Sequence, residues 1–171
     1  RYLAKKNIAT VITLHDCWLF TGHCCHFMGS NCNKWRKKCG NCPEIKTWNS
    51  SWFLDNTRSL LEQKERLLGN IQNLAVVGVS DWVKSFIPYS ILKSAKCITR
   101  IYNCVDINKF QPKNIRGLRE SIGISDEFVV LSVAQNWNQA KGLMDVVAVA
   151  QLNPYMQFLL VGNLIEDIIL P

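Results

Sequence analysis

The sequence lacks any apolar run long enough to cross a membrane. A spanning helix needs about 20 predominantly apolar residues, and polar or charged residues interrupt every apolar stretch of this 171-residue chain before that length. The opening residues RYLAKKNIATVI do not resemble a secretory signal peptide, because their apolar run is short. The chain also has no initiator methionine and stops within the pattern LIEDIILP, so we expect a fragment of a longer protein.

Two standard phosphate-binding motifs are also missing. The sequence contains neither the GxxxxGK[ST] loop of P-loop proteins nor the GxGxxG pattern of dinucleotide-binding folds. It has no internal repeat of the solenoid type either. The sequence therefore does not indicate a P-loop protein, a dinucleotide-binding protein with the GxGxxG loop, or a solenoid.

Basic residues outnumber acidic ones, 20 to 13, which gives a formal net charge of +7. A basic protein favours anionic partners such as phosphates, nucleotides, nucleic acid or an acidic membrane surface. A generally basic surface with no such partner is the alternative. The densest basic group, Lys34, Arg36, Lys37 and Lys38, lies among the cysteines.

Five of the eight cysteines fall between Gly22 and Ile45. Without an export signal, clustered cysteines are more often metal ligands or free thiols than disulfides. Cys39 and Cys42 have the spacing of a zinc knuckle, and the intervening Gly40 and Asn41 permit a tight turn.

Zinc needs four ligands in a tetrahedron, and Cys32 and Cys24, upstream of the knuckle, could supply the other two. Cys25, His23 or His26 could replace Cys24. A structural zinc site formed by Cys24, Cys32, Cys39 and Cys42 and a set of free or buried thiols are equally favoured interpretations, and a disulfide or redox role is a third. We expect the neighbouring Lys37 and Lys38 to lower the pKa of these thiols.

Hydrophobic patterns predict an alternation of strands and helices. Apolar and β-branched runs indicate buried strands, and apolar residues at helical spacing indicate amphipathic helices. Ser80 is a favoured N-cap, and Asp81 suits the positive end of the helix that follows. The expected strands are 8–14, 74–79, 97–102, 128–134 and 157–161, and the expected helices are 55–71, 81–87 and 141–152. This order predicts an α/β fold with parallel strands.

The segment 111–126 divides the chain, because it carries a proline, two glycines and several charges. We therefore expect a domain boundary near residue 110. Residues 1–110 would form one Rossmann-like domain with a cysteine-rich insert at 22–45. Residues 111–171 would begin a second one, since their strand, helix and strand form one βαβ crossover.

His15 and Asp16 follow directly after the first expected strand. Ligands of open parallel sheets collect at the carboxyl ends of the strands. A histidine there can bond a substrate hydroxyl or change charge near neutral pH, and the aspartate can orient it. The alternative is that both residues cap a loop.

The segment VAQNWNQAKGL, 133–143, combines a strand end, a polar loop and a helix start. A helix N-terminus offers amide groups and a positive dipole to phosphate oxygens. Lys141 adds a full charge, and Gly142 permits close approach of the backbone. The alternative is a capping loop with a solvated lysine.

Several distinctive segments occur in a characteristic order. They are TLHDCWLFTGHC, CNKWRKKCGNCPEI, VVGVSDWVKSFI, IYNCVDINKFQP, LSVAQNWNQAKGLMDVV and FLLVG. They run through nearly the whole chain and resemble the bacterial glycosyltransferases of family 4, whose two Rossmann-like domains form the GT-B architecture. The resemblance implies that 1–110 is the C-terminal part of the N-terminal, acceptor-side domain. Residues 111–171 would begin the nucleotide-sugar-binding domain.

The resemblance implies a hexosyltransferase that moves a sugar from a nucleotide-sugar donor to a polysaccharide or lipid-linked glycan, with retention at the anomeric carbon. No cofactor is required for that chemistry in the family, and no nucleic acid is expected as a partner. The basic charge fits a cytoplasmic protein at the inner membrane face.

The resemblance also assigns residues. His15, with Asp16 beside it, matches a strand-end histidine that faces the donor sugar, so both are candidate catalytic residues. Lys141 matches a lysine that contacts the donor phosphates, and we expect Gly142 and Asn136 to accompany it.

At the domain junction, Asn103 matches the family asparagine, and Asp106 belongs to the same element. The sequence departs from the family in three places. The junction glycine is Cys104, a second phosphate-binding arginine is replaced by Gln135 or Asn136, and the E-x7-E motif would lie beyond Pro171. The donor site within this chain is therefore expected to be incomplete.

Two other hypotheses stand beside the enzyme. One is a non-catalytic, zinc-stapled module that binds nucleic acid through Lys34 to Lys38, Trp35 and Trp48. The other is a truncated product without activity.

Overall fold

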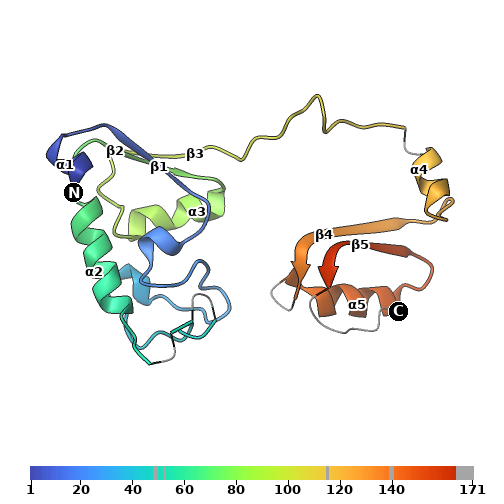
Figure 1. Ribbon diagram of the computed structural model, residues 1–171, viewed down its shortest axis with the longest axis horizontal. Coiled ribbons are helices and arrows are strands. Elements are labelled where there is room, and N and C mark those ends of the chain that lie inside the picture. The colour runs from blue at the N-terminus through green and yellow to red at the C-terminus, as the bar shows by residue number, and fades with distance from the viewer. Residues whose placement is uncertain (48–49, 52, 115, 139–140, 165–171) are drawn as a thin grey trace. The chain divides into compact units, whose positions relative to one another are not determined.

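The computed structural model describes residues 1–47, 50–51, 53–114, 116–138 and 141–164. The chain divides into two units, Arg1–Asp106 and Ile107–Pro171, each of which has its own parallel sheet (Figure 1). The sequence placed this division four residues later, at 110. The two units are described separately below.

The first unit is built on a parallel sheet with the strand order β1-β2-β3. The strands are β1 (Thr10–Leu14), β2 (Leu74–Gly78) and β3 (Cys97–Arg100). Their register pairs Leu14 with Gly78 and Gly78 with Arg100, so all three strands end together. The predicted α/β class is confirmed.

Among the described residues, one α-helix precedes this sheet and two connect its strands. They are α1 (Tyr2–Lys5) before β1, α2 (Thr57–Leu68) between β1 and β2, and α3 (Asp81–Phe86) between β2 and β3. Short 3-10 turns occur at η1 (Trp18–Phe20), η2 (Lys34–Arg36) and η3 (Ile87–Tyr89). The expected Ser80 cap is confirmed, because its side chain accepts a hydrogen bond from the Val83 amide at 3.2 Å.

The core of the first unit lies on one side of the sheet, where Figure 1 shows α2, α3 and the cysteine-rich connection. Val76 of β2 is fully buried there. On the opposite side, Val11 is 68% exposed and lies in register with Ala75 and Cys97. Alternation along the strands therefore sends Val76 into the core and leaves Val11 exposed on the other face.

The connection from residue 17 to 56 is part of this core. It buries Phe20, Phe27 and Trp35, whose rings pack against one another with centroids 5.1 to 5.3 Å from Trp35. Phe86 of α3 joins them, 5.6 Å from Trp35. Burial of these rings accounts for a long connection with little regular secondary structure.

The second unit contains α4 (Arg116–Ser121), β4 (Val129–Trp137), α5 (Leu143–Leu152) and β5 (Gln157–Leu164). β4 and β5 pair in parallel, with an irregularity between Val133 and Asn136. The predicted end of the first strand at 134 is wrong. β4 continues to Trp137 because that indole is buried against Leu143 and Val147 of α5.

Gly162 allows the two strands of this unit to approach. Its φ is +131°, and a Cβ there would collide with the carbonyl oxygen of Ala134. A glycine is therefore required at this position.

Candidate functional site

The carboxyl edge of the first sheet gathers polar side chains from all three strands. His15 and Asp16 follow β1, Ser80 and Asp81 follow β2, and Arg100 ends β3. Because Leu14, Gly78 and Arg100 are in register, these side chains emerge along a single edge. This is the edge at which open parallel sheets bind ligands.

The two residues predicted after β1 differ in their surroundings. His15 is exposed. Asp16 accepts a hydrogen bond from the Trp18 amide at 2.8 Å and lies against the Cys25 thiol, whose pKa is raised by burial and by this carboxylate. Asp16 therefore turns the chain into η1, and His15 is the residue of the pair that is open to a ligand.

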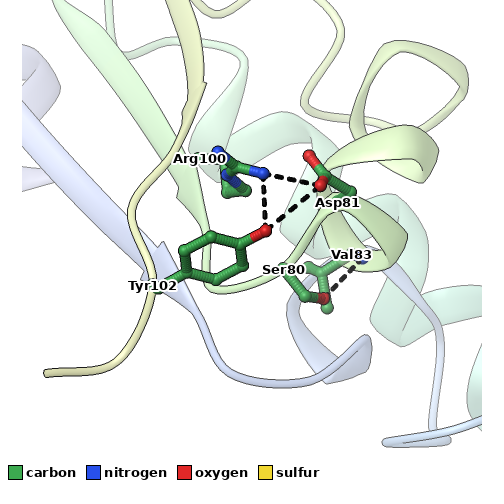
Figure 2. Close-up of polar contacts among 5 residues, drawn as sticks. All are labelled: Ser80, Asp81, Val83, Arg100 and Tyr102. Carbon is green, nitrogen blue, oxygen red and sulfur yellow. Dashed lines mark hydrogen bonds and ion pairs between the residues drawn. The ribbon is translucent and has the colours of Figure 1, made fainter. Parts of the chain in front are cut away.

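Arg100 and Tyr102 complete a polar cluster that the sequence did not suggest (Figure 2). The Arg100 guanidinium lies 2.6 Å from the Asp81 carboxylate and 2.6 Å from the Tyr102 hydroxyl, which itself donates to Asp81 at 3.3 Å. The guanidinium also stacks 4.1 Å from the Tyr102 ring centroid. An exposed pair of this kind stabilises the fold by less than about 1 kcal/mol, so its main effect is to fix the position of the Arg100 side chain at the strand ends.

The residues predicted to bind phosphate lie at the start of α5. Gly142 is the N-cap of this helix with φ +70°, and the exposed Lys141 precedes it, so the expected helix start at 141 is two residues early. The Lys141 amide donates to the Asn138 carbonyl at 3.0 Å. Residues 139 and 140 lie outside the described residues.

Two features of this region differ from the prediction. Asn136 lies within β4 instead of a loop, and its side-chain oxygen accepts a hydrogen bond from Asn163 at 3.3 Å. Asp145 brings a carboxylate into the first turn of α5, within 3.3 Å of where a Cβ on Gly142 would lie. This anion competes with a phosphate for the positive end of the helix.

A hollow of about 630 Å³ lies elsewhere in the second unit, between α5 and β5. Its lining includes Val147, Pro154 and Phe158. The expected phosphate-binding residues are not among the side chains that line it.

The junction residues Asn103 and Asp106 are exposed and lie in a stretch without regular secondary structure. Cys104 stands at the position where the resemblance led us to expect a glycine. It is not among the residues with a positive φ, so a cysteine fits there without strain.

The four cysteines predicted as zinc ligands come together. Cys24, Cys32, Cys39 and Cys42 line a single cavity of about 10 Å³, which is about the space that one water molecule requires. None of the eight cysteines forms a disulfide, and all eight are described. Across the described ranges, no three His, Cys, Asp or Glu side chains already stand in a geometry that could hold a metal ion.

The other candidate zinc ligands, His23, Cys25 and His26, have different surroundings. His23 lines the same cavity and is 9% exposed, and its Nε2 is buried with no hydrogen-bond partner among the residues that the structure describes. Cys25 instead lies beside Asp16. The His26 ring packs near Trp82, with centroids 6.2 Å apart.

The knuckle turn is held by local contacts. Gly40 and Asn41 both have positive φ, +131° and +46°. The Lys34 ammonium donates to both of their carbonyl oxygens, at 3.0 and 2.7 Å. The Cys42 amide donates to the Asp55 carboxylate at 2.7 Å.

The expectation that Lys37 and Lys38 lower the thiol pKa values is wrong. Burial raises the pKa of Cys24 to about 11 and also raises the pKa of Cys39 and Cys42. The nearby cation is Lys64 of α2, which opposes this shift at Cys39.

Lys64 of α2 also contacts the start of the connection directly. Its ammonium donates to the carbonyl oxygens of Trp18 and Thr21, at 2.6 and 2.9 Å, and lies 3.7 Å from the Trp18 ring centroid. Burial lowers its pKa to about 8. The lysine thus ties the helix to the start of the connection.

One of the two tryptophans proposed for nucleic-acid binding is not available for stacking. Trp35 is 1% exposed, so its ring cannot stack on a base. Trp48 lies outside the described residues. The Lys34 ammonium already donates to the carbonyl oxygens of Gly40 and Asn41.

Comparisons with protein-family models, with curated proteins and with solved structures find no match for this chain. In the part of the chain that the structure describes, no helix has the length and apolar character needed to cross a membrane.

Proposed function

We propose that the chain is part of a retaining glycosyltransferase of GT-B architecture that uses a nucleotide-sugar donor. The observation that carries the proposal is the polar carboxyl edge of the first sheet, where the exposed His15 follows β1 and Arg100 ends β3. The ordered resemblance of six segments to family 4 glycosyltransferases supports it independently.

The proposed chemistry assigns different tasks to the two units. In the first, the His15 imidazole would bond a hydroxyl of the donor sugar, and the Arg100 cluster would supply hydrogen-bonding groups nearby. In the second, Lys141 and the first amides of α5 would stabilise the diphosphate that leaves. The acceptor would be a growing polysaccharide or a lipid-linked glycan.

The basic charge of +7 fits a protein that works on anionic substrates. It also fits a cytoplasmic location at the inner membrane face, which remains part of the proposal.

The test is the affinity of the full-length protein for nucleotide sugars. Replacement Lys141→Ala removes a charged hydrogen-bond donor, which is worth about 1.5–3 kcal/mol, so we expect donor binding at least about tenfold weaker. The matched control is Lys113→Ala, which removes another exposed lysine of the same unit. Unchanged affinity in Lys141→Ala, measured by calorimetry, would remove the phosphate assignment.

A further inference from the structure

The cavity in the connection between β1 and α2 has the composition of a metal site. Four of the side chains around it are thiols, and they come from three separate parts of the connection. We infer that Cys24, Cys32, Cys39 and Cys42 bind one zinc ion as four thiolates, and that this ion fastens the connection to the core of the first unit.

The backbone conformation places two of these thiols at the cavity. Gly40 and Asn41 take positive φ values, and the resulting turn presents Cys39 and Cys42 to the same cavity. Lys34 holds this turn from outside through its two carbonyl contacts. Zinc knuckles use the same Cys-x-x-Cys spacing to supply half of a tetrahedron.

Backbone amides point at the sulfur atoms of this pair. The Gly22 amide donates to the Cys39 sulfur at 3.3 Å, and the Glu44 amide lies against the Cys42 sulfur and favours its ionised form. A Cβ at Gly22 would collide with the Thr57 carbonyl oxygen, so only glycine allows this approach. Amide donors of this kind orient metal-bound thiolates and balance part of their charge.

The charge around the cavity also suits a thiolate site. One zinc ion displaces one proton from each thiol, so Zn²⁺ and four thiols give a complex of charge −2 and four released protons. Lys64 lies close enough to Cys39 and Cys24 to interact with both. Its ammonium would therefore oppose the negative charge that the complex carries.

His23 has a defined part in this arrangement. Four thiolates complete the tetrahedron of a structural zinc site, so the His23 imidazole lines the cavity and does not bind the metal. Its Nε2 is buried without a partner among the described residues. With zinc bound, an Nε2–H could donate to one of the thiolates, which would satisfy this atom.

The site would add a metal cross-link to a connection that aromatic packing and a few hydrogen bonds already hold. Trp35 lies between Cys32 and Cys39 in the sequence and lines the same cavity, and it packs against Phe20, Phe27 and Phe86. An ion bound by residues from 24 to 42 therefore closes the connection around the buried indole. This inference does not depend on glycosyl transfer, because metal content is measured without a sugar donor.

The experiment measures metal in protein purified under reducing conditions, by elemental analysis. We expect about one zinc per chain in the wild type, and loss of that zinc in Cys24→Ser, Cys32→Ser, Cys39→Ser and Cys42→Ser. The matched controls Cys97→Ser and Cys104→Ser change exposed cysteines outside the cavity and should keep the zinc. His23→Gln should keep it too.

A second measurement does not require any variant to fold. Zinc in the wild type is replaced by Co²⁺, and the absorption spectrum should show tetrahedral coordination by four sulfur atoms. A spectrum of a site with nitrogen ligands would overturn the ligand set, as would zinc loss in His23→Gln with retention in Cys32→Ser. Wild-type protein without zinc, with iron in its place, or with disulfides among the four cysteines would overturn the inference.

Discussion

Trp35 offers the sharpest test of whether the cysteine-rich connection belongs to the core. The indole is 1% exposed and its centroid lies 5.1 to 5.6 Å from three phenylalanine rings. Replacing a buried tryptophan by alanine costs about 3–5 kcal/mol, because transfer energy is lost and a cavity remains. We therefore expect Trp35→Ala to destabilise the first unit by about this amount.

A second substitution at the same position separates the ring from its polar atom. The Trp35 Nε1 is buried without a hydrogen-bond partner in the described part of the chain, and such a group costs about 1–3 kcal/mol. Trp35→Phe removes this atom and keeps much of the aromatic packing. We expect its loss of stability to be less than half of that in Trp35→Ala.

The assay is urea unfolding followed by far-UV circular dichroism, together with hydrogen exchange of the β2 amides to isolate the first unit. The control is Phe53→Ala, because Phe53 lies in the same connection and is 96% exposed. Its change should stay within about 0.5 kcal/mol. Equal, small effects of Trp35→Ala and Phe53→Ala would show that the connection is not part of the core and would refute the reasoning.

Two further predictions concern the second unit. Gly162→Ala should destabilise the pairing of β4 with β5 by about 1–3 kcal/mol, which hydrogen exchange in both strands would show as faster exchange. The control is Gly117→Ala in α4, where nothing lies near the added Cβ, and it should be neutral or stabilising by up to about 1 kcal/mol. Equal effects of the two substitutions would contradict the prediction. Asp145→Asn removes the anion that competes at the start of α5, so nucleoside diphosphate should bind about two- to fivefold more tightly, while Asp126→Asn should leave binding unchanged. Calorimetry measures the affinity of both variants for the nucleoside diphosphate. Weaker binding in Asp145→Asn would contradict a phosphate site at the start of α5.

The sequence predicted those features that depend on neighbouring residues. Ser80 followed by Asp81 predicted the start of α3, and the side chain does cap the helix. β-Branched runs predicted β2 almost to the residue. These elements follow from local backbone preference and from alternation of burial, which are both visible in a short window.

The sequence did not predict side-chain contacts between residues that are distant in the chain. Arg100 meets Asp81 only because β3 pairs with β2, and 19 residues separate the two. The partners of the Lys64 ammonium, the carbonyl oxygens of Trp18 and Thr21, lie 46 and 43 positions earlier in the sequence. A charged residue on an apolar helix face, with a four-carbon stem, was the one signal that could have suggested a buried contact.

The cysteine cluster lies between these two cases. The spacing of Cys39 and Cys42 predicted a tight turn, and the backbone forms one. The choice between Cys24 and Cys25 depended on the fold, because neighbouring side chains point in different directions. The pKa prediction failed because burial outweighs the charge of exposed lysines.

The most direct test of the central claim is turnover of nucleotide sugars by the full-length protein and by its His15→Ala variant. We predict that the wild type releases a nucleoside diphosphate and that the product keeps the anomeric configuration of the donor, as read by nuclear magnetic resonance. His15→Ala should lower the turnover number by at least about tenfold while its unfolding midpoint stays unchanged. Absence of binding and turnover with every nucleotide sugar, or full activity in His15→Ala, would contradict the account.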